Sequence, residues 1–223
     1  MIPVAFLFLA YLLGATPTSL WVGKAAYGVD LREEGSGNLG ATNTFRILGW
    51  RAALPVLLFD MFKGWLPAAY FAAWAGMESF GWTLAFGGAA IVGHVFSVWA
   101  RFRGGKGVAT SGGVFVALAP WAVLVALVAF FAIAFTTRYV SLASITAALL
   151  VPVVVANTPH RGGDALVYFS VLLATFVIWA HRSNIRRLLR GEENRFGRRT
   201  ASVPGPGPGG EAPDPEGNRG DAA

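Results

Sequence analysis

Three short polar stretches stand out from an otherwise apolar chain. They run from Gly35 to Asn43 (GSGNLGATN), from Gly104 to Gly107 (GGKG) and from His181 to Arg187 (HRSNIRR). Glycine allows consecutive backbone N–H groups to point at one anion, and Lys, Arg, Ser and Asn side chains add further donors. The three stretches together therefore predict a phosphate-binding site.

The composition is that of a multi-pass membrane protein. Of the 223 residues, 55% are hydrophobic and 13% are charged. The net charge of +6 is consistent with nucleic-acid binding, but the cations flank apolar segments, where lipid headgroups and the positive-inside rule account for them. We therefore expect membrane lipids and no nucleic acid as partners. The absence of Cys excludes disulfides and a cysteine-bound acyl intermediate.

The apolar runs predict an all-α polytopic fold with about seven transmembrane helices. Five spans are expected at residues 2–22, 52–74, 81–99, 139–156 and 165–180. The first is read as a retained helix, because it lacks the basic leader of a signal peptide. As one helix, residues 108–137 would reach about 45 Å, against a hydrocarbon core of about 30 Å. We expect Pro120 to split this run into two short passes.

The basic residues predict the orientation. They cluster after the first span, after the third span and near the C-terminal end, whereas the loop 76–81 has none. The positive-inside rule then places the N-terminus outside and the C-terminus in the cytoplasm, which requires an odd number of passes. All three polar stretches share the cytoplasmic face in this arrangement. Residues 1–197 are expected to form the membrane domain, and the Pro/Gly-rich residues 198–223 a disordered tail.

Two nucleotide-binding patterns can be excluded. The sequence G-x-G-x-x-G at residues 35–40 follows a membrane span and not a strand, as a dinucleotide site requires. Gly105-Lys106 lacks the following Ser or Thr and the upstream Gly of a phosphate-binding loop of nucleotide triphosphatases. Either glycine loop alone could be a tight turn between helices. The presence of three polar stretches on one membrane face favours a binding site.

Ionisable residues also occur inside two predicted spans. His94 lies near the cytoplasmic end of the third span, where it is either functional or hydrogen-bonded to the backbone of a neighbouring helix. Asp60 and Lys63 lie one helical turn apart in the second span. We interpret them as a neutralising pair that holds helices together.

Longer motifs around the polar stretches resemble those of the bacterial acyl-phosphate:glycerol-3-phosphate acyltransferases. They comprise residues 35–43 with Arg46, residues 93–97 and 104–110, and residues 181–185 with Arg187, Gly191 and Glu193. The resemblance covers about residues 1–197. Leu39 departs from it, because many family members have proline there; we expect this to change the stiffness of the loop and not its ligand chemistry.

The resemblance implies transfer of a fatty acyl group from acyl phosphate to the 1-hydroxyl of glycerol 3-phosphate, which forms lysophosphatidic acid for phospholipid synthesis. It further implies a bacterial cytoplasmic (inner) membrane location with the active site on the cytoplasmic face, and an upstream soluble enzyme that makes acyl phosphate. We expect no cofactor. Because His and carboxylate residues do not converge at ligand spacing, we expect activity without added metal.

Acyl phosphate has a good leaving group, so the resemblance predicts direct transfer without a covalent acyl-enzyme. By motif position, the substrate-binding and phosphate-binding residues are Ser36, Asn38, Asn43, Arg46, Gly104, Gly105, Lys106, Gly107, Ser141, Asn184, Arg187 and Glu193. The backbone N–H groups of the three glycines are expected to act as donors. Ser141 could instead cap a helix, and Glu193 could be a solvated carboxylate.

The candidate catalytic residues are His94, His181 and Ser36. Either histidine could accept the hydroxyl proton or bind phosphate, and a substrate phosphate oxygen could itself be the base. The His-x-x-x-x-Asp pair of another acyltransferase family is absent, because Trp99, Ala165 and Arg186 occupy the Asp positions. This absence argues against an acyl-CoA enzyme of that type.

A transporter of phosphate or of a phosphorylated solute is the main alternative, since broken helices and glycine-rich loops also build transport sites. The clustering of the polar residues on one face, without an inverted repeat, argues against it. A scaffold that recruits lipid enzymes would explain the basic loops but not the ordered Ser, Asn and His residues within them.

Overall fold

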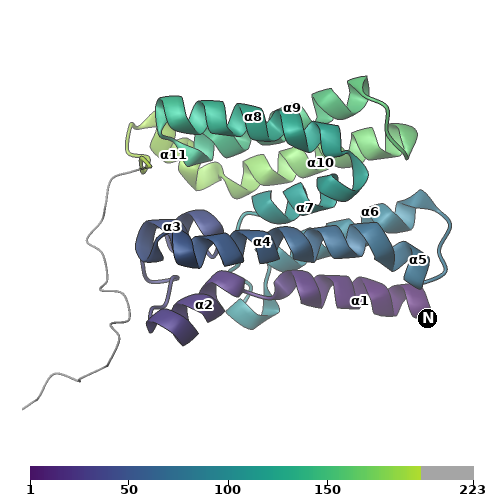
Figure 1. The fold of residues 1–223 in the computed structure, drawn as a ribbon, viewed down its shortest axis with the longest axis horizontal. Coiled ribbons are helices and arrows are strands. Elements are labelled where there is room, and N and C mark those ends of the chain that lie inside the picture. The colour runs from purple at the N-terminus through teal and green to yellow at the C-terminus, as the bar shows by residue number, and fades with distance from the viewer. Residues whose placement is uncertain (197–223) are drawn as a thin grey trace, which may run out of the picture.

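The computed structural model describes residues 1–196, and all its regular elements are helices. The long helices lie side by side along one direction (Figure 1). Five helical segments are long and apolar enough to cross a membrane: Trp50–Trp74, Phe80–Ala100, Pro120–Thr137, Val140–Asn157 and Gly163–Ala180. Four of them match predicted spans to within two residues at each end, so an all-helical, multi-pass membrane protein is confirmed. The predicted tail, residues 198–223, lies outside the described residues.

The first predicted span is broken, which corrects the expectation of one helix over residues 2–22. It consists of α1 (Ile2–Ala15) and α2 (Thr18–Tyr27), which meet at an angle of 43°. Pro17 lies at the break and has no N–H to continue the helical ladder. Counted as one span, this pair raises the number of candidate spans to six.

Side chains from elsewhere in the bundle donate hydrogen bonds to the carbonyl groups that this break leaves free. The Ser97 hydroxyl donates to the carbonyl oxygen of Ala15, and Lys63 Nζ donates to that of Thr16 at 2.8 Å. A buried carbonyl without a partner would be costly in a membrane protein. The two bonds therefore allow the bend to exist inside the helical bundle.

Pro120 separates two helices, as predicted. Helix α7 (Val108–Leu118) ends two residues before it, and α8 (Pro120–Thr137) begins with it. Of the two helices only α7 is short: its 11 residues reach about 16 Å. Helix α8 has 18 residues and meets the length for a span by itself.

The remaining elements are short connections and long helices around the site. Helix α3 (Ala41–Leu48) precedes α4 (Trp50–Leu66), a π-helical turn (Pro67–Phe71) and α5 (Ala72–Trp74). A hairpin then leads to α6 (Phe80–Val95), which ends in a 3₁₀ turn (Val98–Ala100). Helices α9 (Val140–Asn157), α10 (Gly163–Ala180) and α11 (Arg182–Leu189) complete the chain. Helices α2, α3 and α11 lie at the end opposite the N-terminus (Figure 1).

Glycine permits close helix packing at two interfaces. A side chain at Gly14 of α1 would meet the backbone of Ala90 in α6, and one at Gly113 of α7 would meet the carbonyl of Met61 in α4. Small residues at such crossings allow backbones to approach within membranes, where helices are held by packing and not by exclusion of water. These contacts hold α6 and α7 rigidly, and the second polar stretch connects them.

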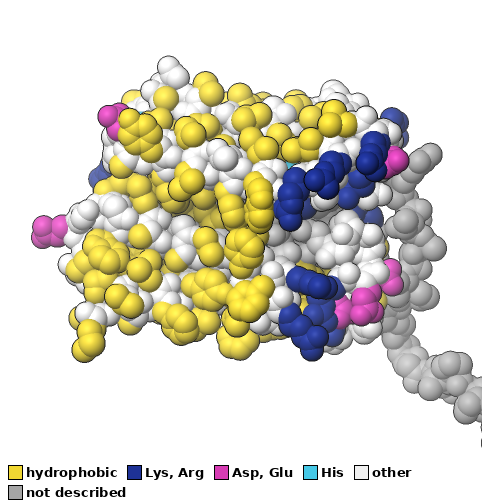
Figure 2. Space-filling model, turned by 180° about the vertical axis from the view of Figure 1, so that it is seen from behind, with side chains coloured by type: hydrophobic (Ala, Val, Ile, Leu, Met, Phe, Trp, Pro, Cys, Tyr) yellow, Lys and Arg dark blue, Asp and Glu magenta, His cyan; other side chains and the backbone are white. Residues whose placement is uncertain are grey.

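The surface divides into an apolar region and a basic end. Large hydrophobic side chains are exposed along the long helices, including Trp121, Val128 and Phe135 of α8. Lys and Arg side chains gather at one end, on both sides of a hollow (Figure 2). This distribution is typical of a protein whose helices face lipid and whose basic loops lie at one membrane surface.

Candidate active site

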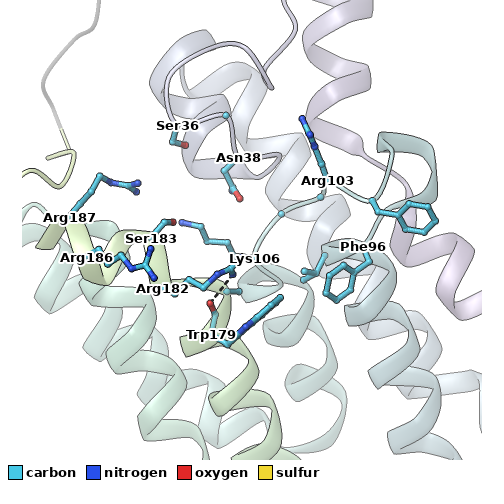
Figure 3. Close-up of a pocket in the computed structure, with 16 residues that line it drawn as sticks. Ser36, Asn38, Phe96, Arg103, Lys106, Trp179, Arg182, Ser183, Arg186 and Arg187 are labelled. Carbon is cyan, nitrogen blue, oxygen red and sulfur yellow. Dashed lines mark hydrogen bonds between the residues drawn. The ribbon is translucent and has the colours of Figure 1, made fainter.

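A cavity of about 380 Å³ lies among the three polar stretches (Figure 3). Sixteen residues line it: Ser36, Gly37, Asn38, Val95, Phe96, Phe102, Arg103, Gly104, Gly105, Lys106, Trp179, Ala180, Arg182, Ser183, Arg186 and Arg187. The structure thus brings together segments more than 140 positions apart in the chain, from Ser36 to Arg187. The predicted convergence of the three stretches is observed.

The cavity carries a surplus of positive charge. Its lining includes Arg103, Lys106, Arg182, Arg186 and Arg187, and no Asp or Glu of residues 1–196 is among the lining residues. The lining also includes the apolar side chains of Val95, Phe96, Phe102 and Trp179. In Figure 3, Arg186 and Arg187 lie on the α11 side and Phe96 lies away from them. This arrangement suits a ligand with phosphate at one end and an apolar chain at the other.

Lys106 is held in the cavity by a chain of hydrogen bonds that ends on Glu193. Its ammonium group donates to Asn184 Oδ1, and Asn184 Nδ2 donates to Glu193 Oε1 at 2.6 Å. Arg187 Nε donates to the other oxygen, Oε2, at 2.7 Å. Glu193 therefore positions two cationic side chains, and its predicted contact with substrate stays a prediction. Asn184 is buried beside them as their link.

The charge of Lys106 is sensitive to pH in a useful range. Burial lowers its pKa to about 8, the carboxylate of Glu193 opposes this shift, and the cations of Arg187 and Arg46 add to it. Desolvation and like charges both disfavour an ammonium ion. A bound phosphate would supply a negative counter-charge beside Lys106 and so favour its ammonium form.

Asn43 organises the first loop from behind. Its Oδ1 accepts from the Ser36 backbone N–H at 2.9 Å and from the Ser36 hydroxyl at 3.1 Å, while its Nδ2 donates to the carbonyls of Leu31 and Glu34 at 3.2 and 3.0 Å. Only 1% of Asn43 is exposed, and it does not line the cavity. Ser36 and Asn38 line the cavity and Asn43 holds their loop, so a direct contact of Asn43 with phosphate stays a prediction.

Arg46 of α3 also lies behind the lining. Its Nη1 is 3.4 Å from Asn43 Oδ1. Burial lowers its pKa, Glu193 opposes this shift and Arg187 adds to it, so its charge acts on the site at longer range. Arg46 does not line the cavity, and its role in phosphate binding stays a prediction. Arg32 is unavailable, because it binds Asp30 at 2.6 Å and holds the pKa of that carboxyl well below its usual range.

The glycines of the second stretch serve close packing. The Gly104 N–H donates to the carbonyl of Val95 at 3.0 Å, and the Gly105 N–H donates to that of His94 at 3.1 Å. The prediction that these two groups donate to phosphate is therefore wrong, since they are already bound to the end of α6. Gly107 has a φ of 79° as the cap of α7, where glycine is favoured, and it does not line the cavity.

Neither candidate catalytic histidine lines the cavity. His94 is 5% exposed, does not line the cavity, and has its Nδ1 3.8 Å from Asp60 Oδ1. Its predicted catalytic role stays a prediction. His181 Nδ1 lies 2.8 Å from the carbonyl of Val177. Because a carbonyl can only accept, Nδ1 carries the proton and Nε2 is left as an acceptor.

His181 is neutral at physiological pH. Burial lowers its pKa to about 4, and the nearby charge of Lys106 adds to this shift. The residue is 3% exposed and its neighbours Ala180 and Arg182 line the cavity. A neutral imidazole beside the cavity can accept a proton, so His181 stays a candidate base.

Ser141 lies at the start of α9 and is almost fully buried. Its hydroxyl finds no hydrogen-bond partner within the part of the chain that the structure describes. It does not line the cavity. The hydroxyl makes no capping bond in α9, and its role in substrate binding stays a prediction.

Several lining residues were not predicted as site residues. Arg182, Ser183 and Arg186 belong to the third polar stretch but were not named as site residues, and Arg103 was interpreted only as a charge that sets the topology. The Arg182 guanidinium lies 4.4 Å from the centre of the Trp179 ring and donates to the Trp179 carbonyl at 3.1 Å. Their position inside or next to the three stretches was the signal that could have identified them.

The buried pair in the second span is confirmed. Lys63 Nζ lies 2.8 Å from Asp60 Oδ1, and the two side chains are 1% and 2% exposed. Thr18 donates to the same carboxylate at 3.2 Å. The pair is thus part of the helix packing at the α1–α2 break, as its spacing predicted.

Comparison with known proteins agrees with this site. The family model described as glycerol-3-phosphate acyltransferase matches residues 4–191. The chain belongs to the glycerol-3-phosphate acyltransferase family. A glycerol-3-phosphate acyltransferase of Fusobacterium nucleatum is 46% identical over 86% of this chain and 96% of its own length. One from Geotalea daltonii is 48% identical over 85% of this chain and 95% of its own.

Solved structures of the same family have the same fold. The glycerol 3-phosphate form of PlsY, an integral membrane glycerol 3-phosphate acyltransferase, is 38% identical, with a TM-score of 0.76 over 87% of this chain and 96% of that one. The lysophosphatidic acid form of PlsY is 37% identical, with a TM-score of 0.77 over 87% and 95% of the two chains. The resemblance found in the sequence motifs is confirmed.

Proposed function

We propose that this member of the family transfers a fatty acyl group from acyl phosphate to the 1-hydroxyl of glycerol 3-phosphate and releases lysophosphatidic acid and inorganic phosphate. The observation that carries the proposal is the cavity itself, whose lining combines five cations with aromatic and apolar side chains. Both substrates contain phosphate, and one contains a long acyl chain. A solved relative exists in glycerol 3-phosphate and lysophosphatidic acid forms, the acceptor and the product of such a reaction.

The residues of the site divide into three roles. Lys106, Arg182, Arg186 and Arg187 bind the two phosphate groups, with neutral donors from the first loop and from Ser183. Phe96 and Trp179 contact the first part of the acyl chain. Glu193 and Asn184 hold Lys106 in position. The preorganised cations need no rearrangement when charge develops, which is how such groups accelerate a reaction.

The chemical step is a direct displacement. The glycerol oxygen attacks the carbonyl carbon of acyl phosphate, the bond from that carbon to the phosphate oxygen breaks, and the phosphate leaves with its electron pair. The hydroxyl proton passes to His181 Nε2 or to an oxygen of the leaving phosphate. Cations beside the leaving group stabilise its charge. Because both substrates are held together, no protein nucleophile and no acyl-enzyme are needed.

We further propose seven passes in the bacterial cytoplasmic membrane, with the N-terminus outside and the C-terminus in the cytoplasm. The α1–α2 pair and the short helix α7 supply the two passes beyond the five long ones. The gathering of Lys and Arg at the end opposite the N-terminus supports this orientation (Figures 1 and 2). The cavity then faces the cytoplasm, where a soluble enzyme can supply acyl phosphate.

Transport of a phosphorylated solute is disfavoured by the helix break. Transporters use broken helices to present free carbonyls and N–H groups to their substrate. In this protein, Ser97 and Lys63 occupy the carbonyls of Ala15 and Thr16. The break therefore serves packing.

Purified protein in lipid vesicles tests the proposal. Labelled acyl phosphate and labelled acyl-CoA are supplied separately at equal concentration, with glycerol 3-phosphate and without added metal. We expect labelled lysophosphatidic acid from acyl phosphate alone. Product from acyl-CoA would contradict the proposed donor. No product from either donor, in folded protein that carries labelled phosphate into the vesicles, would favour the transporter.

A further inference from the structure

The side chain of His94 lies directly behind the second polar stretch. A Cβ atom at Gly105 would meet Nε2 and Cε1 of the His94 ring on one side and the carbonyl oxygen of Leu39 on the other. Gly105 is thus packed between α6 and the first loop. Lys106 is the next residue along the chain, so its backbone position depends on both surfaces.

The backbone of the same turn is fastened to the end of α6. The N–H groups of Gly104 and Gly105 donate to the carbonyls of Val95 and His94 at 3.0 and 3.1 Å. His94 therefore contacts the turn twice, through its ring and through its carbonyl oxygen. Any movement of this residue would be transmitted to the turn that carries Lys106.

The ring is surrounded by a buried polar cluster. His94 Nδ1 lies 3.8 Å from Asp60 Oδ1, which also lies 2.8 Å from Lys63 Nζ and accepts from the Thr18 hydroxyl at 3.2 Å. Lys63 in turn donates to the carbonyl of Thr16. This cluster connects α2, α4 and α6 and limits where the ring can lie.

We propose that His94 is a positioning residue for acyl transfer: its ring supports the Gly104–Lys106 turn from behind and sets the place of Lys106 in the cavity, while Asp60 and Lys63 fix the ring. The role in turnover rests on the proposed function. The contact itself does not depend on it. A displacement of a substrate-positioning group by about 1 Å can cost 100-fold in rate, so a supporting side chain can matter without touching substrate.

The test combines kinetics with a signal from Lys106. The chain contains three lysines, Lys24, Lys63 and Lys106, so ¹³C-methylation of the amines gives few NMR signals, and the Lys106 signal is identified by its loss in Lys106→Ala. In His94→Ala, we expect kcat/KM to fall about 10-fold to 100-fold. We also expect the Lys106 titration midpoint to rise from about 8, because a displaced side chain is less buried.

A matched control removes another buried polar group. Ser170 is 1% exposed and donates to Val167 within α10. We expect Ser170→Ala to leave both the kinetics and the Lys106 signal unchanged. His94→Gln keeps a polar side chain behind the turn and is expected to restore part of the activity. Gly105→Ala, whose Cβ would clash with the His94 ring, displaces the turn and is expected to move the Lys106 signal in the same direction as His94→Ala.

An unmoved Lys106 signal in folded His94→Ala overturns the proposal, whether activity is kept or lost. If His94→Ala does not fold, the same criterion applies to His94→Gln and Gly105→Ala. The NMR signal needs no turnover. A wild-type protein that fails to use acyl phosphate would therefore contradict the proposed donor while leaving the positioning role testable by the signal alone.

Discussion

Two polar clusters in this protein have opposite relations to the cavity. The buried cluster consists of Asp60, Lys63 and His94, and none of its members lines the cavity. The open cluster consists of Lys106, Asn184, Arg187 and Glu193, and two of its members do. Each contains a lysine and a carboxylate.

The difference between the clusters is the balance of charge. Lys63 is paired with Asp60 at 2.8 Å, so the buried cluster has no charge left for a ligand. In the open cluster, the single carboxylate of Glu193 is set against Lys106, Arg187 and the other lining arginines. An excess of cations with access to solvent, and not the presence of ionisable residues in a span, therefore marks the anion site.

The largest expected effect comes from breaking the buried cluster. Asp60→Leu leaves Lys63 buried without a counter-ion, and loss of one partner of a buried pair costs about 3–5 kcal/mol. We expect a correspondingly lower free energy of unfolding, measured by denaturant or heat in detergent. The double variant Asp60→Leu/Lys63→Met should recover much of this loss. An unchanged stability of the single variant would show that the pair does not hold the helices.

Substitutions in the open cluster should lower the activity and leave the stability of the fold unchanged. Lys106→Ala is expected to lower kcat/KM at least about 100-fold, or about 2.7 kcal/mol in transition-state stabilisation, because a cation beside the phosphates is lost. Its unfolding temperature should match the wild type. Lys24 binds Asp30 at 3.0 Å outside the cavity, so Lys24→Ala is the matched control with unchanged turnover. Equal activity of the two variants would remove Lys106 from the site.

The pH dependence of the open cluster follows from Lys106. Its pKa of about 8 means that the ammonium form, which attracts phosphate, prevails below pH 8 and is lost as the pH rises through that value. We expect kcat/KM to fall toward about one tenth for each pH unit above 8. In Lys106→Arg, the fall should disappear because guanidinium stays charged. A fall that persists in the arginine variant would belong to another group.

The smallest expected effect concerns the apolar side of the cavity. Arg182 lies over the Trp179 ring at 4.4 Å, a contact worth about 0.5–1 kcal/mol. Trp179→Ala should therefore raise KM for the acyl donor about 2-fold to 5-fold, with little change for glycerol 3-phosphate. Trp121 on α8 is also exposed and does not line the cavity, so Trp121→Ala is the control. A change in KM for glycerol 3-phosphate alone would contradict the placement of the acyl chain.

The spans could largely be predicted from the sequence, because a single long apolar run crosses a bilayer as a helix, which satisfies its own backbone hydrogen bonds. Spans such as 139–156 and 165–180 agree with α9 and α10 to within two residues. The break at Thr16–Pro17 was missed although Pro17 was visible, since the length of the apolar run outweighed one proline. Its stability depends on Ser97 and Lys63, which no local pattern places beside it.

The sequence predicts which chain segments form the site, but not which of their side chains point into the cavity. Lys106 and Asn184 were identified from their motifs, and the structure places them in contact. Asn43 and His94 were interpreted as ligands because their residue types suit phosphate or proton transfer. Which way a side chain points, and whether a backbone N–H such as that of Gly105 is already bonded, is decided by packing between helices far apart in the sequence. That information lies outside any single motif.

The most direct test of simultaneous binding in one cavity is the initial-velocity pattern with acyl phosphate and glycerol 3-phosphate varied together. Direct transfer between two bound substrates predicts double-reciprocal lines that intersect. Parallel lines, the pattern of a ping-pong reaction through an acyl-enzyme, would contradict direct transfer and require a protein nucleophile that the proposed mechanism does not contain.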